Sequence, residues 1–444
     1  MSSGDQPNPF QAPASSETIN SEMGARSLKR LLEDHKDAIL CVIDQGVVSA
    51  AGLLTSVLIG RHAPEELGVY YIALSIVLFV RGFQQQMIAV PYTIFHHHHK
   101  ESLPGYRGSC LTQQFGLVGI ALVFLIGLIV ASSLGWLETA MVSPLLVLLF
   151  LMPALLMREV VRQYCFTHQE NIGVLSIDSV ISIIQICGLL ALGYLGYLSG
   201  ASAWAVIGLA CFVTLCVWYF RTGPKIQFER KRQLSDWNLN WSFGKWAVGG
   251  QLIGSLPTQI LPWLLVTAAG TAGTGLFAAA MSLVGIANIF NTGMANFLTP
   301  KASQVYVDEG AHGLRRVIFR MALLFLVAVG SFVGLMAVFG GQIALIFGSK
   351  YAGLHLAISI LAVGKLFEGF AIVASNGLFV MERIRENFYV DAILMVVTIT
   401  VAILLIPTFG LMGAVWTSLV GAATGAILRF AVLLVFLNRE TRSE

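Results

Sequence analysis

The sequence predicts an all-helical membrane protein that crosses the bilayer about twelve times. Of its 444 residues, 56% are hydrophobic and only 11% are charged, whereas soluble domains carry roughly 25% charged residues. The mean hydropathy of +0.77 agrees with this composition. So few ionic side chains cannot cover a soluble protein of this size. The composition therefore excludes soluble enzymes, nucleic-acid binders and disordered scaffolds.

Twelve apolar stretches are long enough to cross a hydrocarbon core, which takes about 20 residues. Each gap between them holds a charge cluster or a turn rich in Gly and Pro. The predicted spans are residues 38–60, 67–90, 112–134, 140–157, 172–195, 201–220, 246–269, 276–299, 321–340, 354–380, 388–406 and 411–437.

The distribution of Lys and Arg predicts the orientation of these spans. With both termini in the cytoplasm, 22 of the 27 basic residues lie in cytoplasmic segments. Only Arg61 and Lys350 lie outside, while Arg81, Lys365 and Arg429 lie within spans. Because cytoplasmic loops of membrane proteins carry the excess of basic residues, we expect the N- and C-termini to be cytoplasmic.

The two halves of the chain resemble each other at an offset of 207 to 213 residues. Gly68–Ser75 matches Gly275–Ser282, and Asp178 matches Asp391. Six spans per half is an even number, so the repeat is parallel, and transporters of this kind bind substrate between the halves. The predicted domains are a partly disordered cytoplasmic tail (1–37), an N-terminal six-helix lobe (38–220), a basic cytoplasmic linker (221–245), a C-terminal six-helix lobe (246–437) and a cytoplasmic tail (438–444).

The loops give no sign of an enzyme, a cofactor or a metal site. The longest outside loop, residues 341–353, has 13 residues, too few for a catalytic domain such as a glycan polymerase would need. No GxxxxGK[ST] phosphate-binding loop occurs. Residues 96–99 are four consecutive His, but no Cys or carboxylate stands near them at ligand spacing, so we expect a solvated loop.

Four ordered motifs resemble the polysaccharide and O-antigen (Wzx-type) flippases of the MOP (multidrug, oligosaccharidyl-lipid, polysaccharide) exporter superfamily. They are Ile59-Gly60-Arg61 with Pro64–Tyr70, Ile346–Tyr351, Leu378 with Glu382-Arg383, and Leu405–Pro407 with Gly410 and Gly413-Ala414. The resemblance implies a two-lobed helical bundle, similar to that of MATE transporters, with a central cavity that works by alternating access. Its implied substrate is a polyprenyl-diphosphate-linked oligosaccharide, flipped from the inner to the outer leaflet.

The same resemblance implies a multi-pass protein of the inner (plasma) membrane that serves polysaccharide or lipopolysaccharide biosynthesis. Its partners would then be membrane lipid and the glycosyltransferases or polymerase of the same pathway, and no nucleic acid. The alternative is a multidrug exporter of the same superfamily that moves organic cations and is driven by an ion gradient. A major-facilitator carrier is disfavoured, since residues 96–108 lack the Gly-and-basic signature of that fold.

Two cations within the predicted spans are the best candidates for substrate contacts. Arg81 lies roughly 21 Å from the outer face and Lys365 roughly 16 Å, near the midplane. Charges at this depth are costly and normally face a cavity or a partner, and the planar guanidinium of Arg suits phosphate oxygens. Gln84 and Gln85 follow Arg81 at i+3 and i+4, so the three residues would form a polar stripe on one face of a helix. In the alternative interpretation, Arg81 only pairs with a neighbouring carboxylate.

Acidic residues within the spans have competing interpretations. Asp44 and Glu368 are candidates for an ion-coupling or counter-charge role, but Glu368 and Lys365 are also i,i+3 neighbours that could neutralise each other. Asp178 and Asp391 lie near helix N-termini, where the helix dipole favours a carboxylate. Arg429 either extends its side chain to the interface or pairs with Asp391.

One further polar face lies in the span 276–299. Asn288 and Asn291 stand there, spaced to share roughly one side of a helix. This pattern predicts either residues that line a cavity or hydrogen bonds between helices. Both interpretations are equally compatible with the spacing of the two asparagines.

Overall fold

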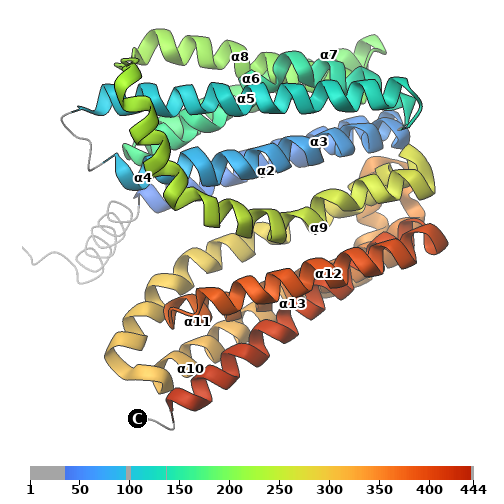
Figure 1. Ribbon diagram of the computed structural model, residues 1–444. Coiled ribbons are helices and arrows are strands. Elements are labelled where there is room, and N and C mark those ends of the chain that lie inside the picture. The colour runs from blue at the N-terminus through green and yellow to red at the C-terminus, as the bar shows by residue number, and fades with distance from the viewer. Residues whose placement is uncertain (1–35, 97–101, 137, 442–444) are drawn as a thin grey trace, which may run out of the picture.

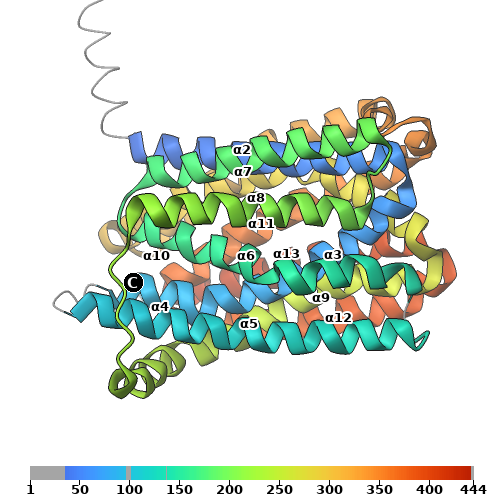
Figure 2. The same ribbon diagram turned by 90° about the horizontal axis from the view of Figure 1, so that it is seen from above.

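The computed structural model describes residues 36–96, 102–136 and 138–441, and within these ranges the chain is helical with no strand. Eleven of the described helices are long and apolar enough to cross a membrane. They run alongside one another through the length of the bundle (Figures 1 and 2). The predicted class, an all-helical multi-pass membrane protein, is confirmed.

The helices form two groups in Figure 1. The first contains α2 (Lys36–His62), α3 (Pro64–Gln84), η1 (Gln85–Ala89, a π-helix), α4 (Val90–Phe95), α5 (Leu103–Ser133), η3 (Thr139–Met141), α6 (Val142–Thr167), α7 (Asn171–Leu195) and α8 (Gly200–Thr222). The second contains α9 (Arg230–Val284), α10 (Ala287–Ala344), η4 (Leu345–Phe347), η5 (Ser349–Leu354), α11 (His355–Val380), α12 (Ile384–Phe409) and α13 (Leu411–Glu440). Extensive packing of α3 against α9 joins the groups.

The predicted span 276–299 does not form one continuous helix. It is divided at Gly285 and Ile286, between the end of α9 and the start of α10. Both long helices also bend at a glycine with positive φ, Gly270 (φ 68°) and Gly310 (φ 65°). Glycine adopts this conformation without steric cost. Between the two bends the chain returns along the bundle (Figure 1).

Two predicted loop segments are helical. The helix α9 begins at Arg230, so most of the expected linker 221–245 continues directly into the next span. The helix α6 continues to Thr167, ten residues beyond the predicted span 140–157. Arg158 and Arg162, predicted to be cytoplasmic loop residues, therefore lie inside a helix. The predicted span ended too early because the average hydropathy falls at the charged residues, whereas the hydrogen-bonded backbone of α6 continues through them.

The two ends of the bundle differ in character. We call the end of the bundle where α4, α6 and α8 end and where the C-terminus lies the basic end, because the sequence predicts basic cytoplasmic segments there (Figures 1 and 2). At the opposite end the two groups of helices are in close contact. There the Tyr351 hydroxyl donates to the carbonyl of Gly60 (3.0 Å), and Arg61 Nε donates to the carbonyl of Ile346 (2.6 Å).

Candidate functional site

A cavity of about 510 Å³ lies between α3 of the first group and α9–α13 of the second. Tyr71 and Ser75 of α3 form one wall. Pro257 and Pro262 lie on the α9 wall, where each removes a backbone donor from the helix. The charged residues of the lining all come from the second group, namely Lys365, Glu368 and Arg429. The cavity therefore lies at the interface between the two groups of helices, and its charged wall belongs to the second group.

Lys365 and Glu368 form an ion pair on the cavity wall. Lys365 Nζ donates to Glu368 Oε2 at 2.7 Å, one turn apart on α11. Lys365 is buried, with a side chain 9% exposed, whereas the carboxylate side chain is 44% exposed. Of the two interpretations of this pair, mutual neutralisation is the one the contact supports. Glu368 remains the charged group of the pair that reaches further into the cavity.

Arg429 and Asp391 form the second ion pair beside the cavity. Arg429 Nη2 donates to Asp391 Oδ1, joining α13 to α12. This is the pairing that the sequence offered as one of two possibilities for Arg429. The guanidinium also donates to the carbonyl of Gly425 at 3.4 Å, so it is held along the cavity wall.

A network of buried charges lies in the first group of helices. Asp44 of α2 and Asp178 of α7 are both almost fully buried. Arg162 of α6 bridges them, with Nη2 at 2.9 Å from Asp44 Oδ2 and Nε at 2.7 Å from Asp178 Oδ2. Arg158 donates to Asp178 Oδ1 from the preceding turn (2.7 Å). The predicted ion-coupling candidate Asp44 is thus already paired with a guanidinium.

This network differs from the prediction made from the sequence. Asp178 was expected to interact with the helix dipole, and Arg158 and Arg162 were expected to lie in a loop. One signal was available: Arg158 and Arg162 are four residues apart, so they share one face of any helix that continues past residue 157. Cations on one face of a membrane helix require carboxylates opposite them.

Arg81 and the two glutamines beside it do not form one stripe. Arg81 is 45% exposed and lies 3.5 Å from Glu159 Oε1 of α6, as in the alternative interpretation of this residue. It is not among the residues that line the cavity. Gln84 is buried and donates to Gln114 Oε1 (3.1 Å) and to the carbonyl of Leu156 (2.6 Å). Gln85 is exposed at the start of η1.

The two predicted asparagines are also separated. Asn288 is exposed and lines the cavity. Asn291 is 3% exposed, and neither its Oδ1 nor its Nδ2 has a hydrogen-bond partner among the described residues. Part of the predicted polar face therefore reaches the cavity and part is enclosed.

The described residues contain no group of three or more His, Cys, Asp or Glu that could hold a metal ion. His96 is buried, with its Nδ1 at 2.9 Å from the carbonyl of Thr93. Residues 97–99 of the predicted solvated His tract lie outside the described residues.

Comparison with solved structures supports the fold, whereas comparison of sequences gives few matches. No family model matches the sequence. The capsular polysaccharide biosynthesis protein CapF of Staphylococcus aureus is 26% identical over 171 residues, which cover 37% of this chain. The match spans 42% of the length of that relative.

Solved structures match over most of the chain. The inward-facing conformation of a multidrug resistance MATE family transporter of the MOP superfamily matches with a TM-score of 0.76 at 17% identity, over 89% of this chain and 96% of that one. The outward-facing conformation of a multidrug resistance MATE family transporter gives a TM-score of 0.64 at 16% identity, over 91% of this chain and 95% of that one. A MOP superfamily transporter from Pyrococcus furiosus gives 0.64 at 15% identity, over the same shares. These neighbours are transporters and not enzymes, and the chain has the fold of a MOP-superfamily transporter.

Proposed function

We propose that the protein flips a polyprenyl-diphosphate-linked oligosaccharide from the inner to the outer leaflet of the plasma membrane, as a step in polysaccharide export. Glycosyltransferases or a polymerase of the same pathway would be its partners. The similarity to a capsular polysaccharide biosynthesis protein points the same way. The MOP transporter fold is common to flippases and drug exporters, so the choice between them depends on charge.

The observation that carries the proposal is the neutralisation of Asp44 and Asp178 by Arg158 and Arg162. A carboxylate that already holds a guanidinium at 2.7 to 2.9 Å offers little to an organic cation or a coupling ion. Arg81 joins this network through Glu159, whose carboxylate also lies 3.7 Å from Arg162, and at 45% exposed Arg81 is the most accessible of these charges. A half-exposed guanidinium suits a diphosphate, which it can hold through two parallel hydrogen bonds.

The contacts at the end opposite the basic end favour a state that is closed to the outside. Tyr351 and Arg61 join the two groups of helices there. The higher TM-score to the inward-facing MATE conformation than to the outward-facing one agrees with this arrangement. In this state the substrate would enter from the inner leaflet.

A second candidate is a multidrug exporter of organic cations. Glu368 favours it, because its carboxylate side chain is 44% exposed at the cavity. A Pyrococcus furiosus MOP transporter has been described with a binding pocket of reversed polarity that suggests a different function. Pocket polarity is therefore the property that an experiment should examine.

The test is reconstitution of the full chain in liposomes of known composition. A fluorescent polyprenyl-diphosphate disaccharide in the inner leaflet would be scored by its accessibility to an added reducing agent, and ethidium accumulation would be measured in parallel. We expect the glycan lipid to move and ethidium not to move. We also expect Arg81→Ala to slow flipping by about tenfold, the effect of losing a charge-assisted hydrogen bond.

The matched control is Arg320→Ala, which removes an exposed Arg of α10 that has no described ion pair. This variant should flip the lipid at the wild-type rate. Ethidium transport without glycan-lipid transport would establish the second candidate. Equal flipping by wild type and Arg81→Ala would remove Arg81 from the mechanism.

A further inference from the structure

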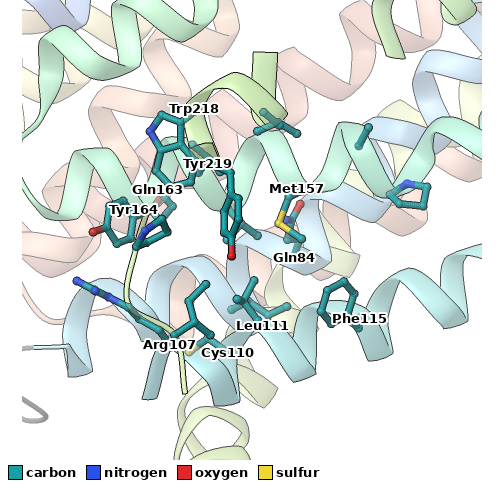
Figure 3. A pocket seen from close by; sticks show the side chains of 18 of the residues that line it. Gln84, Arg107, Cys110, Leu111, Phe115, Met157, Gln163, Tyr164, Trp218 and Tyr219 are labelled. Carbon is teal, nitrogen blue, oxygen red and sulfur yellow. The ribbon is translucent and has the colours of Figure 1, made fainter. Parts of the chain in front are cut away.

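A second and larger cavity, of about 700 Å³, lies in the first group of helices and shares no residue with the cavity between the groups. We call it the lateral slot. Its walls come from the end of α3, η1, α4, α5, α6, α8 and the segment that joins α8 to α9. Figure 3 shows it from close by, with Arg107 near one end and Phe115 near the other. The described residues of the slot are not used by the proposed transport mechanism.

The slot has the shape and the surface of a site for a hydrocarbon chain. Its lining is almost entirely apolar and aromatic, and several of its rings are open to the outside of the bundle: Phe150 is 77% exposed, Phe212 56% and Phe220 84%. Along α6 the lining extends from Phe150 to Tyr164, which is roughly 21 Å of helix. One leaflet with its headgroup region is about 20–22 Å thick. The slot is therefore about one leaflet deep.

A cation stands at the basic end of this slot. Arg107 is partly buried, and its guanidinium lies over the ring of Tyr164, 4.9 Å from the centroid. Its Nη2 is 3.0 Å from Nε2 of His168, and its Nη1 is 3.5 Å from the carbonyl of Lys225. Neither neighbour is an anion. Within the described ranges its Nε has no hydrogen-bond acceptor and no carboxylate forms an ion pair with it.

This lack of a described counter-charge sets Arg107 apart from three other partly buried arginines of the membrane helices. Arg158, Arg162 and Arg429 each have a carboxylate partner. A partly buried guanidinium without one favours an external anion, and a phosphate can accept two of its N–H groups at once. Arg221 and Lys225 are exposed nearby and add to the positive potential. Such clusters at the inner face attract anionic lipids.

We propose that the lateral slot binds an anionic glycerophospholipid of the leaflet at the basic end. One acyl chain would lie along α5, α6 and α8, and the phosphate would contact Arg107 beside His168. No residue of α10–α13, the helices that line much of the transport cavity, lines the slot. It is therefore assigned to a resident membrane lipid and not to the lipid carrier of a transported glycan, and the assignment does not depend on the proposed function.

The test is photolabelling of the full chain in nanodiscs. Phosphatidylglycerol or phosphatidylcholine with a diazirine near the end of one acyl chain would be activated by light, and labelled peptides identified by mass spectrometry. We expect labelling of α5 and α6 within residues 107–115 and 150–164, about tenfold stronger for phosphatidylglycerol. Excess unlabelled phosphatidylglycerol should compete, and farnesyl phosphate should not.

Three variants make the test specific. Arg107→Gln should reduce labelling by phosphatidylglycerol about tenfold, to the level of phosphatidylcholine, while Arg107→Lys should retain part of the preference. Leu111→Trp places an indole in the slot and should reduce labelling by both lipids. Arg320→Gln, an exposed cation of the second group, should change nothing. Size-exclusion elution and thermal unfolding would confirm that each variant is folded.

Three results would overturn the proposal. Equal labelling by the two lipids would show that no anion is recognised. Unchanged labelling of Arg107→Gln by phosphatidylglycerol would remove Arg107 from the site. Competition by farnesyl phosphate, with none by phosphatidylglycerol, would assign the slot to a prenyl carrier instead.

Discussion

Gly68 on α3 and Gly275 on α9 meet backbone to backbone at the end of the bundle opposite the basic end. A Cβ atom on Gly68 would lie 1.9 Å from the carbonyl oxygen of Thr271, and one on Gly275 would lie 1.8 Å from that of Pro64. No side chain fits at these distances. Small residues allow membrane helices to approach this closely. The two glycines also occupy equivalent positions of the sequence repeat, so the halves touch at matching points.

We expect Gly275→Ala to prevent closure at this end and to shift the protein toward a state that is open to the outside. The added methyl group would collide with backbone, which cannot move as a flexible side chain can. The measurement is alkylation of an introduced cysteine at Ser75, a cavity-lining position, by a membrane-impermeant maleimide added from outside. Labelling should be several-fold faster in the Gly275→Ala background.

Gly119→Ala is the control for this prediction. Gly119 also lies in a membrane helix, α5, but a Cβ there would meet no atom within 4 Å. Replacing glycine by alanine in a helix is otherwise favourable by about 0.5–1 kcal/mol, so this variant should label at the background rate. Equal labelling rates for the Gly119 and Gly275 variants would contradict the idea of a glycine contact that seals the outer end.

The Asp44–Arg162–Asp178 network predicts a large loss of stability when its central cation is removed. Arg162→Ala would leave two buried carboxylates with reduced compensation, because only Arg158 would remain beside Asp178. Breaking a buried ion pair by removing one partner costs about 3–5 kcal/mol. We therefore expect Arg162→Ala to unfold at a clearly lower temperature in detergent, or to fail to accumulate in the membrane.

The double variant Arg162→Leu with Asp44→Asn provides the check, since it removes one charge of each sign. It should recover much of the lost stability relative to Arg162→Ala. Arg81→Ala is the comparison at the exposed edge of the same network, where ion pairs contribute about 1 kcal/mol or less. If Arg162→Ala and Arg81→Ala unfold at the same temperature, the network does not stabilise the fold.

The same network shows where sequence reasoning reaches its limit in this chain. Hydropathy identified the apolar core of nearly every helix, because crossing a bilayer requires a long apolar run whatever the tertiary structure. It could not extend α6 through Arg158 and Arg162. These side chains are accommodated by Asp44 and Asp178, and the residues of the Asp44–Arg162 pair are 118 positions apart in the chain.

Contacts between side chains one helical turn apart could be predicted from the sequence, and contacts between residues far apart in the chain could not. Lys365 and Glu368 are one helical turn apart, so their contact followed from helical geometry alone. The separation of Gln84 from Gln85 did not, because it depends on Gln114 of α5 and Leu156 of α6, which enclose Gln84. Tertiary packing decides which face of such a helix becomes a cavity wall.

The Lys365–Glu368 pair predicts opposite effects of two substitutions on the proposed substrates. Lys365→Met would leave Glu368 as an unpaired, partly exposed anion at the cavity. We expect it to reduce flipping of a lipid diphosphate by about tenfold or more, through charge repulsion and loss of the cation, and to improve binding of an organic cation such as tetraphenylphosphonium. Glu368→Gln should have the reverse effect on cation binding.

Flipping in liposomes and equilibrium binding of the cation would measure these two effects side by side. The double variant Lys365→Met with Glu368→Gln is the matched control, because it removes both charges from α11. Its cation binding should equal that of the wild type. Unchanged flipping by Lys365→Met would show that the glycan-lipid substrate does not use the cationic side of this cavity.

Asn291 gives a prediction about stability and transport together. Its amide is buried, and both of its polar atoms lack a hydrogen-bond partner in the described part of the chain. A buried polar group left unpaired costs about 1–3 kcal/mol. We therefore expect Asn291→Leu, which is similar in volume, to raise the free energy of unfolding by about 1 kcal/mol. Asn288→Leu, at an exposed position of the same helix, should give no such gain.

We expect the Asn291 amide to find a hydrogen-bond partner in another conformation, because it is unpaired and costly in this one. If Asn291 finds its hydrogen bonds only when the cavity opens outward, Asn291→Leu will stabilise the present state and slow turnover at the same time. Thermal unfolding in detergent and flipping in liposomes measure the two effects on one preparation. A variant that is more stable and equally active would assign Asn291 to packing alone, and one that is less stable would show that its amide is satisfied.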